Sequence, residues 1–104
     1  MARLIWTEPA LDDLDRITEY IALDSPAAAS RFFTTVFDRV TRLEAHPKSG
    51  KKPAELPRTP YRDIVVPPCR IFYRIEKNNV YIVYVMRSER LLRPYLLQLR
   101  EESK

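Results

Sequence analysis

The spacing of apolar residues changes about halfway along this chain, and that change restricts the fold more than any other feature. Up to residue 43, bulky apolar residues recur at steps of three and four, which is typical of amphipathic helices. From residue 61 onward they fall in short runs that mix apolar, tyrosine and charged residues, which is typical of strands. Helices followed by consecutive strands predict an α+β domain.

The N-terminal half predicts a short strand and two helices. Arg3–Trp6 is apolar and β-prone, so we expect an opening strand. Thr7-Glu8-Pro9 then predicts a helix start, with Thr7 as the cap and proline in the first turn. Asp24-Ser25-Pro26 predicts a second start of the same kind, and that helix should end before Pro47. The short join between the helices predicts an antiparallel αα-hairpin. The apolar stripe of the first helix comprises Leu11, Leu14, Ile17 and Ile21.

The C-terminal half predicts a loop, a small antiparallel sheet and a closing helical segment. Residues 46–60 are rich in proline and lysine and should form the loop. Lys77-Asn78-Asn79 predicts a hairpin turn, because asparagine tolerates positive φ. Residues 87–100 have a helical pattern, which Pro94 should kink or split into a short turn and a helix. The expected strands are Tyr61–Val66, Cys69–Glu76 and residues 80–86.

We therefore predict one domain, residues 1–104, of the α+β class. An N-terminal strand and an αα-hairpin pack on one face of a small antiparallel β-sheet, with a C-terminal helical segment.

Composition excludes several classes of protein. Gly50 is the only glycine, so no glycine-rich phosphate loop is present and a nucleotide-binding α/β enzyme is excluded. One histidine and one cysteine cannot form a zinc cage, so we expect no metal and no cofactor. Cys69 has no partner for an internal disulfide, which fits a reducing cytoplasm. No segment has the length of a membrane span or the apolar run of a signal peptide, so we expect a cytoplasmic protein without membrane contact.

The positive charge lies in the second half of the chain. Residues 53–104 carry 10 basic and six acidic side chains, and most of the basic ones are arginines. Guanidinium groups pair well with phosphate and carboxylate, so an acidic partner is one interpretation and a solvated basic face is the other. The acidic residues Asp12, Asp13, Asp15 and Glu19 should form an exposed face of the first helix.

A series of short segments between residues 4 and 99 gives a further signal through its order and spacing. The segments are Trp6 followed by Leu11-x-x-Leu14-x-x-Ile17-x-x-Tyr20-Ile21, then Ala27-Ala28-Ala29, Leu43-x-x-His46-Pro47-x-x-Gly50, Tyr61-Arg62-Asp63, Arg70-Ile71-Phe72-Tyr73-Arg74 and Arg87-Ser88-Glu89-Arg90. With these segments the chain resembles the RelE/ParE superfamily of bacterial type II toxins. The first helix and the Ser25-Pro26 start of the second are more similar to the ParE branch.

The resemblance implies a growth-inhibiting toxin, with a role in plasmid stabilisation, that a cognate antitoxin neutralises. ParE-like members poison DNA gyrase, so this protein would be a binding protein and not an enzyme. A toxin dimer within the toxin–antitoxin complex is compatible with the resemblance. Target or antitoxin binding would then use Arg70, Arg74, Arg87, Arg90, Arg93, Leu91, Leu92 and Leu96.

The alternative is a RelE-like, ribosome-dependent mRNA interferase that cleaves RNA through attack by the 2′-hydroxyl. That chemistry needs a proton acceptor, a proton donor and cations beside the phosphorane. The residues at matching places are Arg62, Arg70, Arg90 and Tyr95. The paired lysines of the RelE strand are absent, and Asp63 follows Arg62 instead. Arg70 and Arg74 have a purely structural interpretation too, as cross-strand partners of Asp63 or Glu76.

Overall fold

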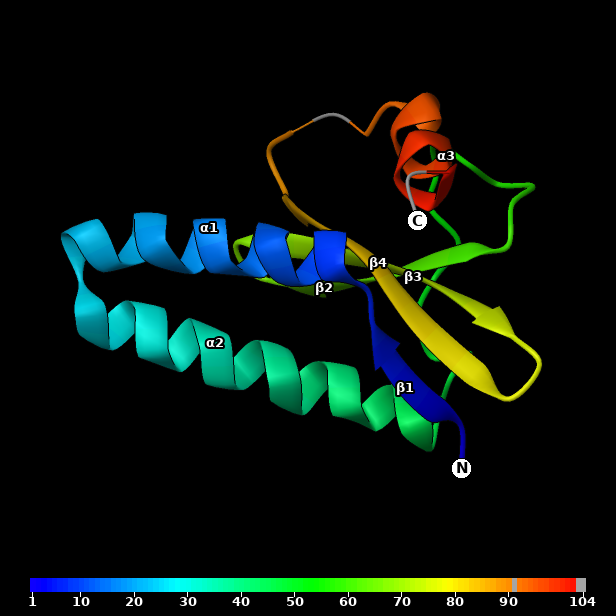
Figure 1. Cartoon of the computed structure of the whole chain (residues 1–104), viewed down its shortest axis with the longest axis horizontal. Coiled ribbons are helices and arrows are strands. Elements are labelled where there is room, and N and C mark those ends of the chain that lie inside the picture. The colour runs from blue at the N-terminus through cyan, green and yellow to red at the C-terminus, as the bar shows by residue number, and fades with distance from the viewer. Residues whose placement is uncertain (91, 103–104) are drawn as a thin grey trace.

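The computed structural model describes residues 1–90 and 92–102, without the side chains of Pro94, Tyr95 and Glu102. Figure 1 shows a helical hairpin, a twisted sheet and a separate C-terminal helix. Within the described residues, no helix is both long and apolar enough to cross a membrane. The elements in chain order are β1 (Arg3–Trp6), α1 (Glu8–Asp24), α2 (Pro26–Thr41), the 3₁₀ turn η1 (Arg42–Glu44), β2 (Tyr61–Val66), β3 (Cys69–Glu76), β4 (Asn79–Arg87) and α3 (Pro94–Glu102).

The two helices of the hairpin begin where the sequence predicts. The Thr7 hydroxyl accepts a hydrogen bond from the Ala10 N–H at 3.4 Å and caps α1. The Ser25 hydroxyl accepts one from the Ala28 N–H at 3.1 Å and caps α2. Each cap satisfies a backbone donor that the first helical turn would otherwise leave unpaired. The join between α1 and α2 is therefore the single residue Ser25, which forces the helices to run antiparallel.

The sheet is mixed, which differs from the antiparallel sheet expected from the sequence. The strand order is β1-β4-β3-β2, and β1 pairs with β4 in parallel. The pairs β2–β3 and β3–β4 are antiparallel, as expected for hairpin neighbours. The hairpin of helices and two strands separate β1 from β4, and so long a connection allows the parallel pairing. The predicted α+β class and element order are otherwise confirmed.

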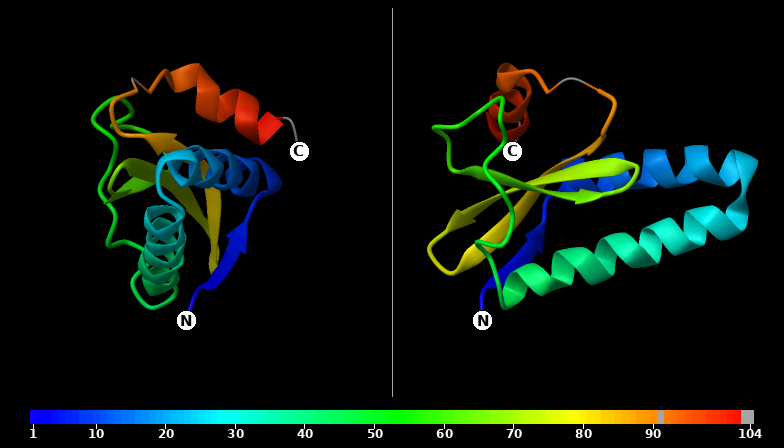
Figure 2. Two further views of the ribbon diagram at one scale, coloured as in Figure 1. Left: turned by 90° about the vertical axis from the view of Figure 1, so that its left-hand side faces the viewer. Right: turned by 180° about the vertical axis from the view of Figure 1, so that it is seen from behind.

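The helices cover both faces of the sheet, whereas the sequence predicted one covered face. Figures 1 and 2 show α2 and α3 on opposite sides of the strands. On the hairpin side, Leu14 and Val36 pack against the sheet residues Ile71 and Val85. On the other side, Leu92 and Leu97 pack against a second set, which comprises Phe72, Val83 and Met86. Val83 is an extra residue in β4 at a register shift, so the strand presents both Val83 and Tyr84 to this second face.

In the C-terminal half, the structure differs from the sequence prediction at the end of β4 and in the residue of the β3–β4 turn that has a positive φ. β4 continues to Arg87, and α3 begins at Pro94, so the proline opens the helix and does not kink it. This is the predicted split into a turn and a helix, and it agrees with the preference of proline for the first helical turn. In the β3–β4 hairpin the positive φ, 56°, falls on Lys77 and not on an asparagine.

Candidate functional site

Arg70 on β3 is held by two carboxylates. Its guanidinium donates to both oxygens of Glu55, at 2.8 and 3.0 Å, and to Oδ2 of Asp63 at 2.8 Å. The Asp63 side chain is fully buried, and Lys51 Nζ lies 3.0 Å from its other oxygen. The Arg70 side chain is 13% exposed. The structural interpretation of Arg70, pairing with Asp63, is thus present in the fold.

The pair with Arg70 shifts the titration of Glu55. The hydrogen bond from Arg70 is the largest cause, and it lowers the pKa of Glu55 from 4.5 to about 2. A carboxyl group with a lowered pKa contributes stability above its unfolded pKa and loses it as the pH falls through the folded value.

We expect Glu55→Gln to destabilise the fold only where wild-type Glu55 is ionised. Above about pH 5 the variant should lose about 1–2 kcal/mol of unfolding free energy, because water partly screens this pair. The difference from wild type should shrink as the pH falls from about 5 and vanish only below about pH 2, where folded Glu55 becomes protonated. Denaturant unfolding at a series of pH values measures it. A difference that does not change with pH would contradict the expected role of the Glu55 charge.

Arg74 connects the sheet to α3. Its Nε donates to Glu101 of α3, and its Nη1 donates to Glu76. Its guanidinium also lies 4.3 Å from the centre of the Tyr81 ring. The Tyr61 hydroxyl donates to the same Glu101 at 3.3 Å, and burial beside this carboxylate raises the pKa of Tyr61 to about 12. Arg74 is therefore a packing residue beneath α3.

Of the residues predicted for RNA cleavage, Arg62 and Arg70 do not share a face of the sheet. Arg62 pairs in register with Tyr73, so it lies on the hairpin face of the sheet, opposite to Arg70. Its guanidinium donates to the Gly50 carbonyl at 2.8 Å. Arg90 is exposed in the turn after β4. Tyr95 belongs to α3, but its side chain lies outside the described residues.

The leucines predicted for partner binding differ in their surroundings. Leu92 is 2% exposed and belongs to the core beneath α3. Leu96 is partly buried, Arg93 is exposed, and Leu91 lies outside the described residues. As folded, Leu92 is not displayed to a partner.

Four arginines converge beside α1 and form what we call the arginine cleft, a cavity of about 170 Å³. Asp13 lies among them and is 4% exposed, so the expectation of an exposed acidic face was wrong at this residue. It accepts two hydrogen bonds from Arg100 of α3, at 2.7 and 3.1 Å. Its position three residues after buried Ala10, next to Leu14, is the sequence signal that could have shown its burial. The cleft is lined by Asp13, Arg16, Ile17, Tyr84, Val85, Met86, Arg87, Arg90 and Arg100.

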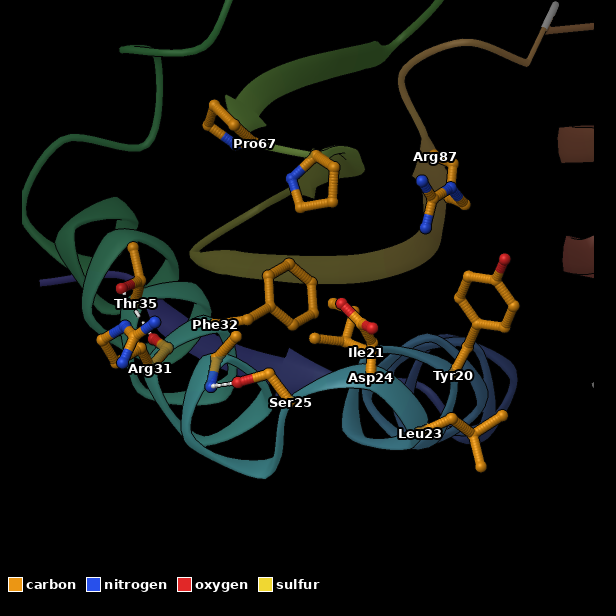
Figure 3. Close-up of a pocket in the computed structure, with 12 residues that line it drawn as sticks. Tyr20, Ile21, Leu23, Asp24, Ser25, Arg31, Phe32, Thr35, Pro67 and Arg87 are labelled. Carbon is orange, nitrogen blue, oxygen red and sulfur yellow. Dashed lines mark hydrogen bonds between the residues drawn. The ribbon is translucent and has the colours of Figure 1, made fainter.

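A larger open groove of about 880 Å³ lies between the tip of the helical hairpin and the β2–β3 turn, and we call it the hairpin groove. Figure 3 shows Pro67 and Arg87 on one side, with Leu23 and Ser25 on the other. Leu23 is 85% exposed. The groove could not be predicted from the sequence, because three separate segments form it. Its lining mixes apolar side chains with polar and charged ones, and comprises Tyr20, Ile21, Leu23, Asp24, Ser25, Ala28, Arg31, Phe32, Thr35, Pro67, Pro68 and Arg87.

Comparison with known proteins gives one consistent result. The family described as "ParE toxin of type II toxin-antitoxin system, parDE" matches residues 4–92. "Toxin RelE2" of Caulobacter vibrioides is 35% identical over 92 residues, which are 88% of this chain and 100% of that protein. "Putative toxin Y4kP" of Sinorhizobium fredii is 38% identical over 88 residues, covering 83% and 88% of the two chains. A solved structure titled "Chromosomal ParDE TA system from P. aeruginosa" superposes with a TM-score of 0.71 at 26% identity, covering 86% of this chain and 98% of that one.

Proposed function

Since the chain belongs to the ParE toxin family of type II toxin–antitoxin systems, with a cognate antitoxin as its partner, we propose that it arrests growth by binding DNA gyrase and stabilising the cleaved gyrase–DNA complex. In this proposal the protein acts by binding and performs no bond-breaking step. The name of one relative, Toxin RelE2, makes ribosome-dependent mRNA cleavage the second candidate.

The observation that supports binding over RNA cleavage is the state of the sheet arginines. Stabilising a phosphorane needs guanidinium groups that are free to face the phosphate. Arg70 is occupied by Glu55 and Asp63, and Arg62 lies on the other face of the sheet. Arginine is also a poor general base, since its pKa stays above about 12. These contacts favour a protein whose arginines stabilise the fold and present charge to a partner.

Induced expression in bacterial cells distinguishes the two candidates. We expect growth arrest, accumulation of gyrase-linked DNA breaks and uncut mRNA, with growth restored when the antitoxin is expressed. Primer extension on abundant mRNAs and DNA extraction after protein denaturation measure the two outcomes in one culture. Early mRNA cleavage with intact DNA would contradict gyrase as the target and support the interferase.

The hairpin groove is the surface that we propose for the antitoxin. Its floor and walls offer aliphatic and proline carbons from α1, α2 and the β2–β3 turn. Pro67 and Pro68 have no N–H group, so this turn presents an apolar wall. Arg31 and Arg87 lie among the lining residues and would meet carboxylates. The groove therefore suits an amphipathic antitoxin segment that carries bulky aliphatic residues and acidic side chains.

We expect Leu23→Asp to weaken antitoxin binding by roughly 10- to 100-fold, because one aliphatic contact is lost and a charge is added in the groove. Leu23 is 85% exposed, so the variant should fold normally. Leu99→Asp is the matched control, since Leu99 is 54% exposed on α3, away from the groove. Calorimetric titration of each variant with purified antitoxin measures the change. Equal losses for both variants, or none for Leu23→Asp, would place the antitoxin elsewhere.

A further inference from the structure

The arginine cleft carries an unbalanced positive charge. Among the described residues that line it, Arg16, Arg87, Arg90 and Arg100 are basic and Asp13 is acidic. These arginines come from α1, the end of β4, the turn after β4 and α3, so tertiary packing brings them together. Arg87 also pairs with the exposed Glu89, which offsets one further charge. The charged side chains that line the cleft therefore keep a net positive charge. The cavity is large enough to hold one tetrahedral oxyanion.

The Asp13 carboxylate is fully engaged and cannot neutralise a further arginine of the cleft. Its Oδ1 accepts from Arg16 at 3.0 Å and from Arg100, and its Oδ2 accepts from Arg100 and from the Val85 N–H at 3.0 Å. Both oxygens are thus fully used. The Arg16 guanidinium donates one hydrogen bond to Asp13, which leaves its other N–H donors available, and the side chain is 71% exposed. Within residues 1–90 and 92–102, the exposed Arg90 guanidinium makes no hydrogen bond or ion pair.

The aromatic rings at the cleft favour a duplex over a single strand. Proteins recognise unpaired bases largely by stacking them on open aromatic faces. Here the Arg100 guanidinium lies 4.3 Å from the centre of the Tyr84 ring. The centre of the Phe72 ring lies 6.0 Å from the centre of the same Tyr84 ring. Arg87 lies 5.6 Å from the centre of the nearby Tyr20 ring. Tyr84 lines the cleft and is partly buried, whereas Tyr20 is 65% exposed and lines the hairpin groove instead. The described lining of the cleft therefore offers cationic donors without an open aromatic face, which matches the sugar–phosphate backbone of a duplex.

We infer that the arginine cleft is a binding site for a phosphodiester phosphate of duplex DNA, contacted by Arg16, Arg87 and Arg90. This site goes beyond the proposed target, because it concerns contact between the toxin and DNA without gyrase. It would let the toxin touch the DNA segment that gyrase holds.

Fluorescence anisotropy with a labelled DNA duplex and the purified full chain tests this site. The cleft variant combines Arg16→Gln with Arg90→Gln, two exposed side chains whose loss should not unfold the protein. The matched control combines Arg39→Gln with Arg58→Gln, which are exposed elsewhere and remove the same charge. We expect the cleft variant to lose roughly tenfold or more in affinity. The slope of log K against log salt should fall by about 2, and the control should stay near wild type.

Further arms of the experiment identify the ligand. Inorganic phosphate should displace the duplex more effectively than chloride at equal ionic strength, and a labelled single-stranded RNA should bind more weakly than the duplex. The inference is overturned if cleft and control variants lose affinity equally, if RNA binds more tightly, or if phosphate binds and the duplex does not. No gyrase is present, so failure of the gyrase proposal leaves this result unaffected.

Discussion

Replacing Arg70 by alanine should lower the free energy of unfolding by about 3 kcal/mol, because it leaves the buried carboxylate of Asp63 without its closest cation. Lys51 stays 3.0 Å from the other oxygen, but its side chain is 59% exposed and compensates only in part. For a domain of this size, the melting temperature should drop by about 10–20 °C. Thermal unfolding followed by circular dichroism measures the effect.

Two further variants separate the buried charge from other effects of the substitution. Arg58→Ala removes an exposed arginine from the loop before β2 and should change stability by less than about 0.5 kcal/mol. Arg70→Met combined with Asp63→Asn removes both charges and should be more stable than Arg70→Ala. An unchanged melting temperature for Arg70→Ala would show that the Asp63 contact contributes nothing.

The lower stability of Arg70→Ala can by itself reduce the toxicity of that variant. If Arg70→Ala abolishes growth inhibition, the loss has two explanations, unfolding and a missing functional group. The Arg70→Met and Asp63→Asn pair distinguishes them, because it restores the fold without restoring the guanidinium. Toxicity that returns with the fold assigns Arg70 to stability.

Replacing Gly50 by alanine should also cost about 3 kcal/mol, through overpacking and a disturbed hydrogen bond. An added Cβ would lie 2.5 Å from the Tyr73 hydroxyl oxygen and 2.9 Å from the Asp63 carbonyl oxygen. The Tyr73 side chain cannot move away from the added Cβ, because it is fully buried and its hydroxyl donates to the Pro47 carbonyl at 2.7 Å. The same hydroxyl accepts from the Gly50 N–H at 2.9 Å. The chain therefore needs its single glycine for close packing.

The neighbouring Ser49→Ala is the control for this prediction, since Ser49 is exposed and should tolerate the change. Adding Tyr73→Phe to Gly50→Ala removes the nearest clashing atom, so the double variant should cost less than the sum of the two single ones. Chemical denaturation of the four proteins completes this cycle. Strict additivity would contradict a clash with the tyrosine hydroxyl.

The sequence predicted those parts of the fold that depend on local signals. Thr7 and Ser25 mark helix starts, because a cap and a following proline act within one turn. The β2, β3 and β4 strands follow from apolar patterning and a short turn. The parallel partner of β1 could not be predicted, because that pairing joins segments more than 70 residues apart. The burial of the second face was missed for the same reason, since it depends on where α3 docks.

The candidate sites were harder to predict than the fold. The arginines of β3 were visible, but their carboxylate partners include Glu55 from a proline-rich loop and Glu101 from the last helix. Neither partner has a fixed spacing from the arginine it holds. Asp13 was assigned to an acidic surface because Asp12, Asp15 and Glu19 lie close to it in the chain and are acidic as well. The hairpin groove and the arginine cleft each need several elements, so they are properties of the packed chain alone.

We propose that this ParE-family toxin inhibits gyrase by binding. The most direct test incubates purified, folded protein with DNA gyrase, relaxed plasmid and ATP, and then separates the DNA on a gel. We expect supercoiling to stop as the toxin concentration rises and linear plasmid to appear after protein denaturation and digestion. Full supercoiling with no linear DNA, at concentrations where the antitoxin binds the same protein preparation, would contradict it.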